Sequence, residues 1–439
     1  MNEPGKLFIK TFGCQMNVYD TEKIYAFLQD SYVPAASEED ADVIILNTCS
    51  IREKAEQKVY SLLGRIKPLK AVKPDLLVGV GGCVAQQEGE RILRRSPVVD
   101  VVFGTHNVGE LPELLDERLR NGKRICRVLE DTGEVPNAKA PKIRGSGKPA
   151  SLLTIMKGCD NYCAYCIVPY VRGREVSRPA SEITAEAAFM VDHGVREITL
   201  LGQNVNSYRD PVSGTGFVPL LESLENVKGL ERIRFVTSHP KDFSPELAHA
   251  MADLPKVCEH IHLPIQAGSD RVLAAMKRGY TSRQYLEKVE LLSKLVPGVE
   301  FTTDIIVGFP GEERGDFERT LDILREVRYQ NVFSFRFSSR KGTAAATMND
   351  PLPDSVRRPW LPELQDVQNS ITAEKHQNQV GKEVEILVEG LDKKGVLLEG
   401  RTRTNYIVHF PGEASLIGGI VRVRLKSSGT IHMIGELVN

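Results

Sequence analysis

Three cysteines near the amino terminus each follow a strand-like apolar run. Cys14 comes after "KLFIKTF", Cys49 after "DVIILNT" and Cys83 after "LLVGVGG", with polar helical stretches between the runs. This alternation over residues 5–125 predicts an α/β domain with a parallel sheet. Parallel strands bring their carboxyl ends to one edge, so the three thiols are expected around one crevice. Buried core cysteines are the alternative, but these would be scattered along the strands.

A second group lies in "GCDNYCAYC", where Cys159, Cys163 and Cys166 share one short segment and Tyr165 precedes the last cysteine. A [4Fe–4S] cluster normally takes four thiolates, one for each iron. Three cysteines therefore leave one iron open to a small chelating molecule. Zinc is the competing metal, but a zinc site needs a second ligand pair at comparable spacing, and the next histidine, His193, is isolated in a helical stretch.

Composition and the amino terminus indicate a reducing compartment. The sequence has no run of about 18 apolar residues, and "MNEPGKLFIKTFGC" has an acid and a proline where a signal peptide has basic and apolar residues. We therefore expect a cytoplasmic protein with no membrane contact. In that compartment the 8 cysteines should serve metal or redox chemistry and not disulfides. Cys126 and Cys258 fit neither group and are interpreted as ordinary thiols.

The hydrophobic pattern predicts two further domains after the first. Residues 138–151 are dense in Pro, Gly and Lys and are predicted to form a linker. Residues 145–375 hold about six strand-and-helix units, which suit a partial TIM-like barrel with its active site at the carboxyl ends of the strands. Residues 378–439 change to short strands separated by glycine turns, which predicts a small all-β, OB-like barrel.

Polar residues follow several predicted strands of the middle domain. Amides and hydroxyls at such positions suit the ribose and amino-acid groups of a cofactor. Each alone is typical of turn chemistry or of a capped helix start, whereas recurrence at successive strand ends favours cofactor contacts. The residues are Gln203, Asn204, Ser238, His239, Gln266 and Ser269.

A net charge of −1 gives no overall attraction to a polyanion, so nucleic acid would have to bind local basic patches. In "RVRLK" a period of two puts Arg422, Arg424 and Lys426 on one strand face, where they could follow phosphates or simply be solvated. Arg172, Arg174 and Arg178 follow the second cysteine group and are placed to meet phosphates or carboxylates. The remaining basic patches are Arg401 with Arg403, and Lys139, Lys142, Arg144 and Lys148.

The C-x3-C-x2-C spacing with an aromatic residue before the last cysteine resembles the signature of radical S-adenosylmethionine enzymes. The resemblance implies that the amino and carboxylate groups of S-adenosylmethionine chelate the open iron. It also implies that an electron from the reduced cluster cleaves the sulfonium to a 5′-deoxyadenosyl radical. The segment "GFPGE" at 308–312 resembles a family segment near the adenine.

Longer motifs are similar to those of methylthiotransferases, and more narrowly to the MiaB family, tRNA 2-methylthio-N6-dimethylallyladenosine synthases. They include "KTFGCQMNVYDTE", "NTCSIREKAEQKVYSLLGR" and "REITLLGQNVNSY", while "GRTRTNYIVHFPG" resembles the TRAM RNA-binding domain. The resemblance implies two [4Fe–4S] clusters, S-adenosylmethionine, a tRNA anticodon stem-loop, an electron donor of flavodoxin or ferredoxin type and a sulfur source.

The same resemblance implies that an isopentenyladenosine next to the anticodon gains a methylthio group at carbon 2. One S-adenosylmethionine would methylate a sulfur at the cluster of Cys14, Cys49 and Cys83, and a second would yield the radical. The alternatives are the same chemistry on threonylcarbamoyladenosine in tRNA or on a ribosomal-protein aspartate, and a non-catalytic iron–sulfur sensor that binds RNA. Lys341 stands where the family often has proline, a departure that concerns only a local loop.

Overall fold

The computed structural model describes residues 3–50, 53–129, 148–429 and 431–438, and the chain divides into two compact units. The first unit comprises Met1–Arg144, Met156–Asp160 and Ile167–Val176. The second comprises Gly145–Ile155, Asn161–Cys166 and Ser177–Asn439. Within the described ranges, no helix combines the length and apolar character that crossing a membrane requires.

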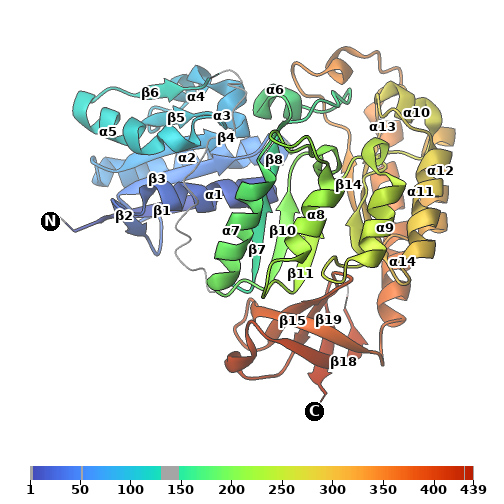
Figure 1. Cartoon of the computed structure of the whole chain (residues 1–439). Coiled ribbons are helices and arrows are strands. Elements are labelled where there is room, and N and C mark those ends of the chain that lie inside the picture. The colour runs from blue at the N-terminus through green and yellow to red at the C-terminus, as the bar shows by residue number, and fades with distance from the viewer. Residues whose placement is uncertain (1–2, 51–52, 130–147, 430, 439) are drawn as a thin grey trace. The chain divides into compact units, whose positions relative to one another are not determined.

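The first unit is built on a parallel sheet with the strand order β2-β1-β3-β4-β5-β6 (Figure 1), which confirms the prediction for this region. The strands are β1 (Gly5–Thr11), β2 (Tyr32–Pro34), β3 (Val43–Thr48), β4 (Leu77–Gly82), β5 (Val101–Phe103) and β6 (Ile125–Arg127). The helices are α1 (Gln15–Leu28), α2 (Glu53–Val72), α3 (Cys83–Glu88), α4 (Glu90–Arg95), α5 (Leu111–Asn121) and α6 (Val168–Arg172).

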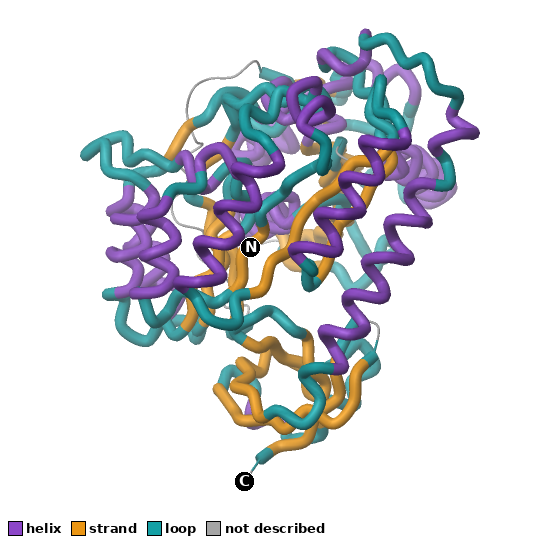
Figure 2. Tube along the Cα trace, turned by 90° about the vertical axis from the view of Figure 1, so that its right-hand side faces the viewer, coloured by secondary structure: helices purple, strands orange, loops and turns teal. Residues whose placement is uncertain are grey.

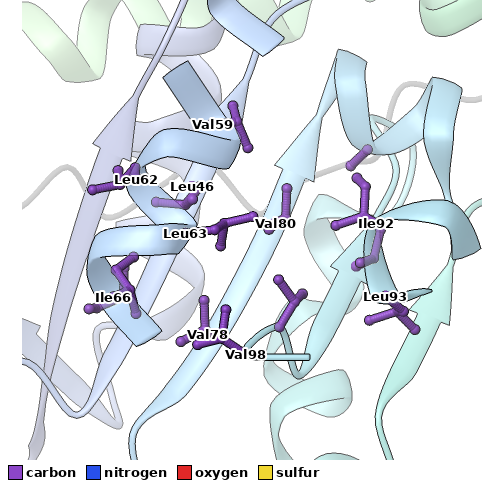
Figure 3. Packing of buried hydrophobic residues seen from close by; sticks show 14 of the residues in the cluster. Leu46, Val59, Leu62, Leu63, Ile66, Val78, Val80, Ile92, Leu93 and Val98 are labelled. Atoms are coloured by element: carbon purple, nitrogen blue, oxygen red, sulfur yellow. The ribbon is translucent and has the colours of Figure 1, made fainter. Parts of the chain in front are cut away.

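Both faces of this sheet are buried, as expected for parallel strands covered by helices. Successive residues of β3 point to opposite faces. Leu46 packs with Leu63 of α2 in one core cluster (Figure 3), to which Ile44 also belongs. Val43 and Ile45 pack in a second cluster with residues of α1 and α5. The run "VIILNT" lacks apolar–polar alternation because every residue in it is buried.

The middle of the chain forms a partial barrel of parallel strands, which confirms the prediction. Its sheets have the orders β11-β10-β7 and β12-β13-β14, and a parallel bridge between Ile233 and Val257 joins them in chain order. The strands are β7 (Ala150–Thr154), β10 (Glu197–Leu201), β11 (Arg232–Phe235), β12 (His260–His262), β13 (Glu300–Val307) and β14 (Asn331–Arg336). The helices around them are α7 (Ala180–Asp192), α8 (Phe217–Glu225), α9 (Pro245–Asp253), α10 (Asp270–Ala275), α11 (Ser282–Leu295), α12 (Arg314–Val327) and α13 (Asp354–Arg357).

Two short strands, β8 (Met156–Lys157) and β9 (Val176–Ser177), pair separately from these sheets. The linker predicted at 138–151 lies mostly outside the described residues. Its carboxyl-terminal end differs from the prediction, because β7 already begins at Ala150. Ala150 and Ser151 of β7 pair with Glu197 and Ile198 of β10, so the strand extends backwards into the expected linker.

The carboxyl-terminal strands close into the predicted small barrel, with the order β15-β16-β17-β19-β18. Figure 2 shows its strands in orange at the end of the long helix α14 (Trp360–Gln377). The strands are β15 (Glu383–Leu391), β16 (Leu398–Thr402), β17 (Ile407–Phe410), β18 (Ile420–Ser428) and β19 (Met433–Leu437). The barrel is filled by Ile386, Val388, Leu398, Tyr406, Val408, Phe410, Val423, Leu425 and Met433.

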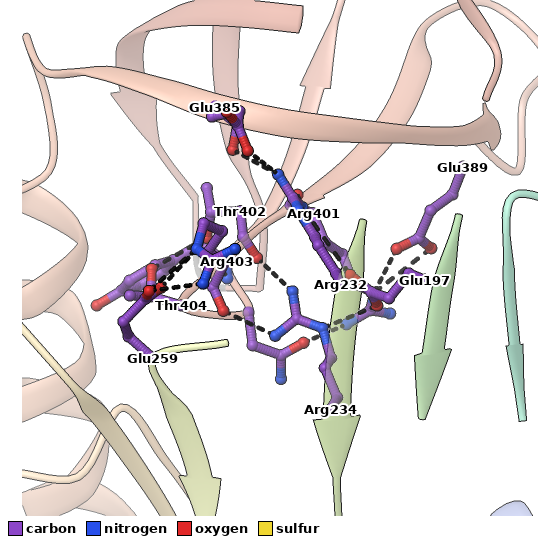
Figure 4. Close-up of polar contacts among 12 residues, drawn as sticks. Glu197, Arg232, Arg234, Glu259, Glu385, Glu389, Arg401, Thr402, Arg403 and Thr404 are labelled. Atoms are coloured by element: carbon purple, nitrogen blue, oxygen red, sulfur yellow. Dashed lines mark hydrogen bonds and ion pairs between the residues drawn. The ribbon is translucent and has the colours of Figure 1, made fainter. Parts of the chain in front are cut away.

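A buried polar network joins the small barrel to the partial barrel within the second unit (Figure 4). Arg234 of β11 donates to Glu197 Oε1 of β10 at 2.8 Å. The same guanidinium donates to the carbonyl oxygens of Thr402 and Arg403 at 2.7 and 2.8 Å. Arg232, whose side chain is 0% exposed, also bonds to the small barrel, through a backbone carbonyl oxygen and a carboxylate.

The network lies at the amino-terminal ends of the partial-barrel strands, since Glu197 begins β10 and Arg232 begins β11. Active sites of parallel barrels lie at the opposite ends. Arg403 pairs with Glu259 at 2.7 Å, and Arg401 pairs with a carboxylate of its own barrel. These two arginines therefore serve internal contacts, which corrects their interpretation as a basic patch.

Glu197 provides a stability test of this network. Glu197→Gln leaves the buried guanidinium of Arg234 without its carboxylate, and breaking such a pair costs about 3–5 kcal/mol. We expect a loss of that order in the free energy of unfolding, measured by urea denaturation. The control is Glu290→Gln, because Glu290 and Lys294 form a pair that is 65% and 70% exposed. Its cost should stay below about 1 kcal/mol, and equal costs for the two variants would contradict the role of Glu197.

Candidate active site

Cys14, Cys49 and Cys83, called the sheet trio below, lie at the carboxyl ends of three neighbouring strands. Cys49 directly follows β3, Cys83 directly follows β4, and Cys14 lies between β1 and α1. The structure thus places all three at one edge of the sheet. A Cβ added to Gly13, whose φ is +121°, would lie 2.2 Å from Cβ of Cys49. Only glycine allows the backbone at Cys14 to run this close to Cys49.

The electrostatic surroundings differ within the sheet trio. The pKa of Cys14 is lowered to about 6, first by a hydrogen bond with Cys49 and further by the charge of Arg172. Burial raises the pKa of Cys83, although Arg172 acts against this shift. The thiolate is the form that binds metals. The protein therefore favours the metal-binding form of Cys14 before any metal is present.

Arg172 lies in the interior of the first unit. Its Nη2 is 2.9 Å from Oδ2 of Asp20, and the two side chains are 8% and 16% exposed. A buried guanidinium paired with a carboxylate is not presented to RNA phosphates, so the RNA-binding prediction for Arg172 is corrected to an internal role. Arg174 is 75% exposed and lies 3.4 Å from Asp160.

Cys159, Cys163 and Cys166, called the loop trio below, follow β8 in the chain. Cys159 and Cys163 are buried and Cys166 is partly exposed. Cys159 falls in the first unit, whereas Cys163 and Cys166 fall in the second. The amide of Cys166 donates to the carbonyl oxygen of Cys163 at 2.9 Å, which forms a tight turn. None of the described cysteines forms a disulfide bond.

Arg278 contacts the loop trio and was missed by sequence reasoning. Its Nη1 lies 3.3 Å from Sγ of Cys163 and 3.3 Å from the hydroxyl of Tyr165. It also donates to the hydroxyl of Tyr280 at 2.9 Å and to the carbonyl oxygen of Pro264 at 2.7 Å, so its orientation is fixed. No motif marks Arg278, because Cys163 lies 115 positions away in the chain.

Two strand ends of the partial barrel carry buried polar atoms that no described residue satisfies. They are the side-chain amides of Gln203 and Asn206, after β10, and the hydroxyl of Ser238, after β11. A buried polar group without a partner costs about 1–3 kcal/mol. These atoms are therefore suited to receive a polar ligand. Gln203 and Ser238 are predicted from their positions after strands, whereas Asn206 is not, although Asn206 shares the segment "GQNVNS" with Gln203.

Two other predicted cofactor contacts have partners within the protein. The amide of Asn204 donates to Asp242 at 2.7 Å and accepts from the backbone of His239 at 3.0 Å. Ser269 donates to Asp316 Oδ1 at 2.6 Å. These bonds hold the loops after β10, β11 and β12. Asn204 and Ser269 are therefore supports of the strand ends in this structure.

His239 and Gln266 are buried near the loop trio and the edge of β13. Nε2 of His239 lies 3.8 Å from Sγ of Cys163, and burial, aided by the charge of Arg278, lowers the pKa of His239 to about 2. The ring is therefore neutral. Gln266 has a φ of +75° and bridges to Ile305 through its backbone.

The "GFPGE" segment is a rigid turn after β13. Oε2 of Glu312 accepts from the amides of Gly308 at 2.5 Å and Phe309 at 3.0 Å. Burial raises the pKa of Glu312 to about 7 despite these bonds. Arg357 donates to the carbonyl oxygen of Gly308 at 3.0 Å. The turn is thus held by its own carboxylate and by a second helix.

The cations predicted on one strand face are exposed along β18. Arg422, Arg424 and Lys426 point outward, and the two residues between them are buried in the barrel. Arg424 lies 2.5 Å from Glu383, and Lys426 lies 2.6 Å from Glu436. Exposed ion pairs contribute little stability. These cations can therefore exchange their carboxylates for phosphates at small cost.

Among the described residues, no three His, Cys, Asp or Glu side chains meet tightly enough to hold a single metal ion. A [4Fe–4S] cluster is larger than one ion, so its cysteines surround it and do not converge on a point. The sheet trio, with the close approach at Gly13 and the cation of Arg172, fits such a group. Cys163 with Arg278 beside it suits a thiolate ligand of another.

Gly13 provides a test of the sheet trio. Gly13→Ala adds a methyl carbon that would lie 2.2 Å from Cβ of Cys49, which is too close for two non-bonded carbon atoms. We expect anaerobically reconstituted protein to lose about four irons, counted together with sulfide, while its circular dichroism is unchanged. Gly64→Ala is the control, because an added Cβ there meets nothing within 4 Å. Full iron content in Gly13→Ala would contradict a cluster at this edge.

Three family models match the chain. "Uncharacterized protein family UPF0004" matches residues 6–104, "Radical SAM superfamily" matches residues 153–324 and "TRAM domain" matches residues 377–430. These ranges contain most of the parallel sheet, most of the partial barrel and most of the small barrel, respectively. The middle region is thus a radical SAM domain and the last a TRAM domain.

Among solved structures, the cobalamin-dependent S-adenosylmethionine radical enzyme OxsB is similar with a TM-score of 0.54, at 15% identity over 85% of this chain and 56% of that chain. The radical S-adenosylmethionine methyltransferase TsrM from Kitasatospora setae has a TM-score of 0.54 at 13% identity, over 78% of this chain and 77% of that chain. At such identity these matches show a shared fold alone.

Relatives are similar over the full length. The tRNA-2-methylthio-N(6)-dimethylallyladenosine synthase of Moorella thermoacetica is 51% identical, covering 98% of this chain and 98% of that protein. The synthase of the same name from Geobacter sulfurreducens is 50% identical, covering 100% of this chain and 98% of that protein. This chain therefore belongs to the family of tRNA-2-methylthio-N(6)-dimethylallyladenosine synthases.

Proposed function

We propose that this chain acts in the cytoplasm on an isopentenyladenosine next to the anticodon of a tRNA and adds a methylthio group at carbon 2 of the adenine. The observation that carries the proposal is full-length similarity, at 51% identity, to a relative named for this product. The two cysteine trios support it, because the reaction needs both a radical and a place to hold sulfur.

The loop trio is proposed to hold a [4Fe–4S] cluster, with S-adenosylmethionine on the iron that lacks a cysteine. When bound, these groups supply one-electron cleavage of the sulfonium and hence a carbon radical. Such chemistry suits carbon 2, which has neither an acidic proton nor a leaving group. The unpartnered side chains of Gln203 and Ser238 are proposed to bind the polar groups of S-adenosylmethionine.

The protein's own contribution at this site is orientation and charge. Arg278 fixes the thiol of Cys163 and the hydroxyl of Tyr165 through bonds of 3.3 Å each. His239 stays neutral beside Cys163, because burial lowers its pKa to about 2. Cys163 therefore faces the cation of Arg278 and a neutral imidazole.

Cys14, Cys49 and Cys83 are proposed to hold a second [4Fe–4S] cluster, which would supply a place to hold the sulfur for the methylthio group. Two further partners follow from the chemistry. An electron donor of flavodoxin or ferredoxin type must reduce the cluster of the loop trio, and a sulfur source must replace the sulfur that leaves with each product. The tRNA itself is proposed to contact the cations of β18 and Arg174, which are exposed.

Nucleoside mass spectrometry of tRNA from a deletion strain tests this function. We expect loss of the 2-methylthio derivative and accumulation of isopentenyladenosine. The wild-type gene and Cys126→Ala, which lies outside both trios, should restore the derivative, whereas Cys163→Ala should not. Loss of methylthio-threonylcarbamoyladenosine instead would favour that substrate. Unchanged tRNA, with no 5′-deoxyadenosine from reduced protein and S-adenosylmethionine, would favour an iron–sulfur sensor.

Replacing Arg422, Arg424 and Lys426 together with Ala tests the RNA contact. We expect weaker tRNA binding and a salt dependence whose slope falls by about two, at about 0.7 for each contact to a single strand. Binding is measured across a salt titration. The control is Lys393→Ala with Lys394→Ala, two exposed lysines in the turn before β16. An unchanged slope in the triple variant would remove β18 from the RNA interface.

A further inference from the structure

We infer that Arg172 is a positioning residue for the iron–sulfur cluster of the sheet trio: Asp20 holds its guanidinium at the cysteine edge, where its positive charge favours the reduced cluster. The inference rests on the proposed function, because it takes a cluster to be bound there. Arg172, Asp20 and the whole sheet trio belong to the first unit. This role accounts for the burial of the Arg172 guanidinium, which contact with RNA phosphates would not explain.

The packing of helix α6 places Arg172 near the sheet edge at which Cys14, Cys49 and Cys83 lie. It ends helix α6, and Ile167 and Val171 from this segment form one buried cluster with Cys83. The hydroxyl of Thr105, in the loop after β5, donates to the carbonyl oxygen of Val171 at 2.6 Å. Helix α6 is thus held against the first residue of α3 by apolar contact and by a hydrogen bond, independently of the charge of Arg172.

Asp20 orients the guanidinium from the other side. The ion pair of 2.9 Å is nearly buried, and Asp20 lies in the second turn of α1, whose N-cap is Cys14. Arginine has five N–H donors in a rigid fork, so the bond to Asp20 leaves others for the sulfurs. The ion pair thereby joins α6, which packs against Cys83, to α1, which begins directly after Cys14.

The sign of the electrostatic effect separates this role from simple support of the fold. Hydrogen bonds to sulfur and net charge set the potential of an iron–sulfur cluster. Reduction adds negative charge, so a nearby guanidinium favours the reduced form and a nearby carboxylate opposes it. Removing the charge of Arg172 should therefore make reduction harder, and removing the charge of Asp20 should make it easier. If the ion pair only supported the fold, the two substitutions would not shift the reduction potential in opposite directions.

The experiment uses the full chain with Cys159, Cys163 and Cys166 replaced by Ala, so that only the sheet trio binds a cluster. After anaerobic reconstitution, the midpoint potential is measured by a redox titration followed by electron paramagnetic resonance. We expect Arg172→Gln to disfavour reduction about tenfold, or roughly 59 mV for one electron, and Asp20→Asn to shift it the opposite way. Arg172→Lys should retain part of the effect. Arg174→Gln, on the same segment but 75% exposed, is the control.

Opposite shifts for Arg172→Gln and Asp20→Asn support the inference. Equal potentials in parent, Arg172→Gln and Asp20→Asn overturn it but leave the proposed function intact. If Arg172→Gln binds no iron, Asp20→Asn decides: a rise in potential supports the inference, and no rise overturns it. If the parent with only the sheet trio binds no iron, the second cluster of the proposed function fails, and this inference fails with it.

Discussion

Parallel pairing of β1, β3 and β4 is the constraint on which the sheet trio depends. The register sets Thr11 beside Asn47, and Asn47 beside Gly81, so the three strands end level with one another. Residues that follow them must meet at one edge. Antiparallel neighbours would have sent alternate strand ends to opposite edges. Cysteines far apart in sequence thus become neighbours because the strands share a direction, and the glycine before Cys14 lets them approach.

The partial barrel uses the two ends of its strands for different purposes. At the carboxyl ends lie unpartnered polar atoms of Gln203 and Ser238, and Arg278 faces the loop trio. At the amino-terminal ends, Arg232 and Arg234 donate hydrogen bonds to backbone carbonyl groups of the small barrel and so hold it in place. Groups available to a ligand therefore lie at the carboxyl ends of these strands, and groups that stabilise the fold lie at the amino-terminal ends, as in other parallel barrels.

Arginine is the residue whose role was hardest to predict. The sequence predicts Arg172 and Arg403 as candidates for contact with a polyanion, yet both pair with carboxylates of the protein. The side chain is long and its charge permanent, so its partner depends on which distant segment folds beside it. Arg422 and Arg424 differ because their strand has one buried face, and period two then requires the other face to be exposed.

The sequence by itself determined the parallel sheet, the partial barrel, the small barrel and the two cysteine trios, because these follow from local periodicity and from position relative to strand ends. Only the tertiary structure decided that Arg172 and Arg278 lie beside cysteines, that Asn204 and Ser269 support loops, and that the amide of Asn206 has no partner among the described residues. Those contacts join segments far apart in the chain. The sequence shows which polar and charged groups a residue carries, whereas the tertiary structure determines which other groups they contact.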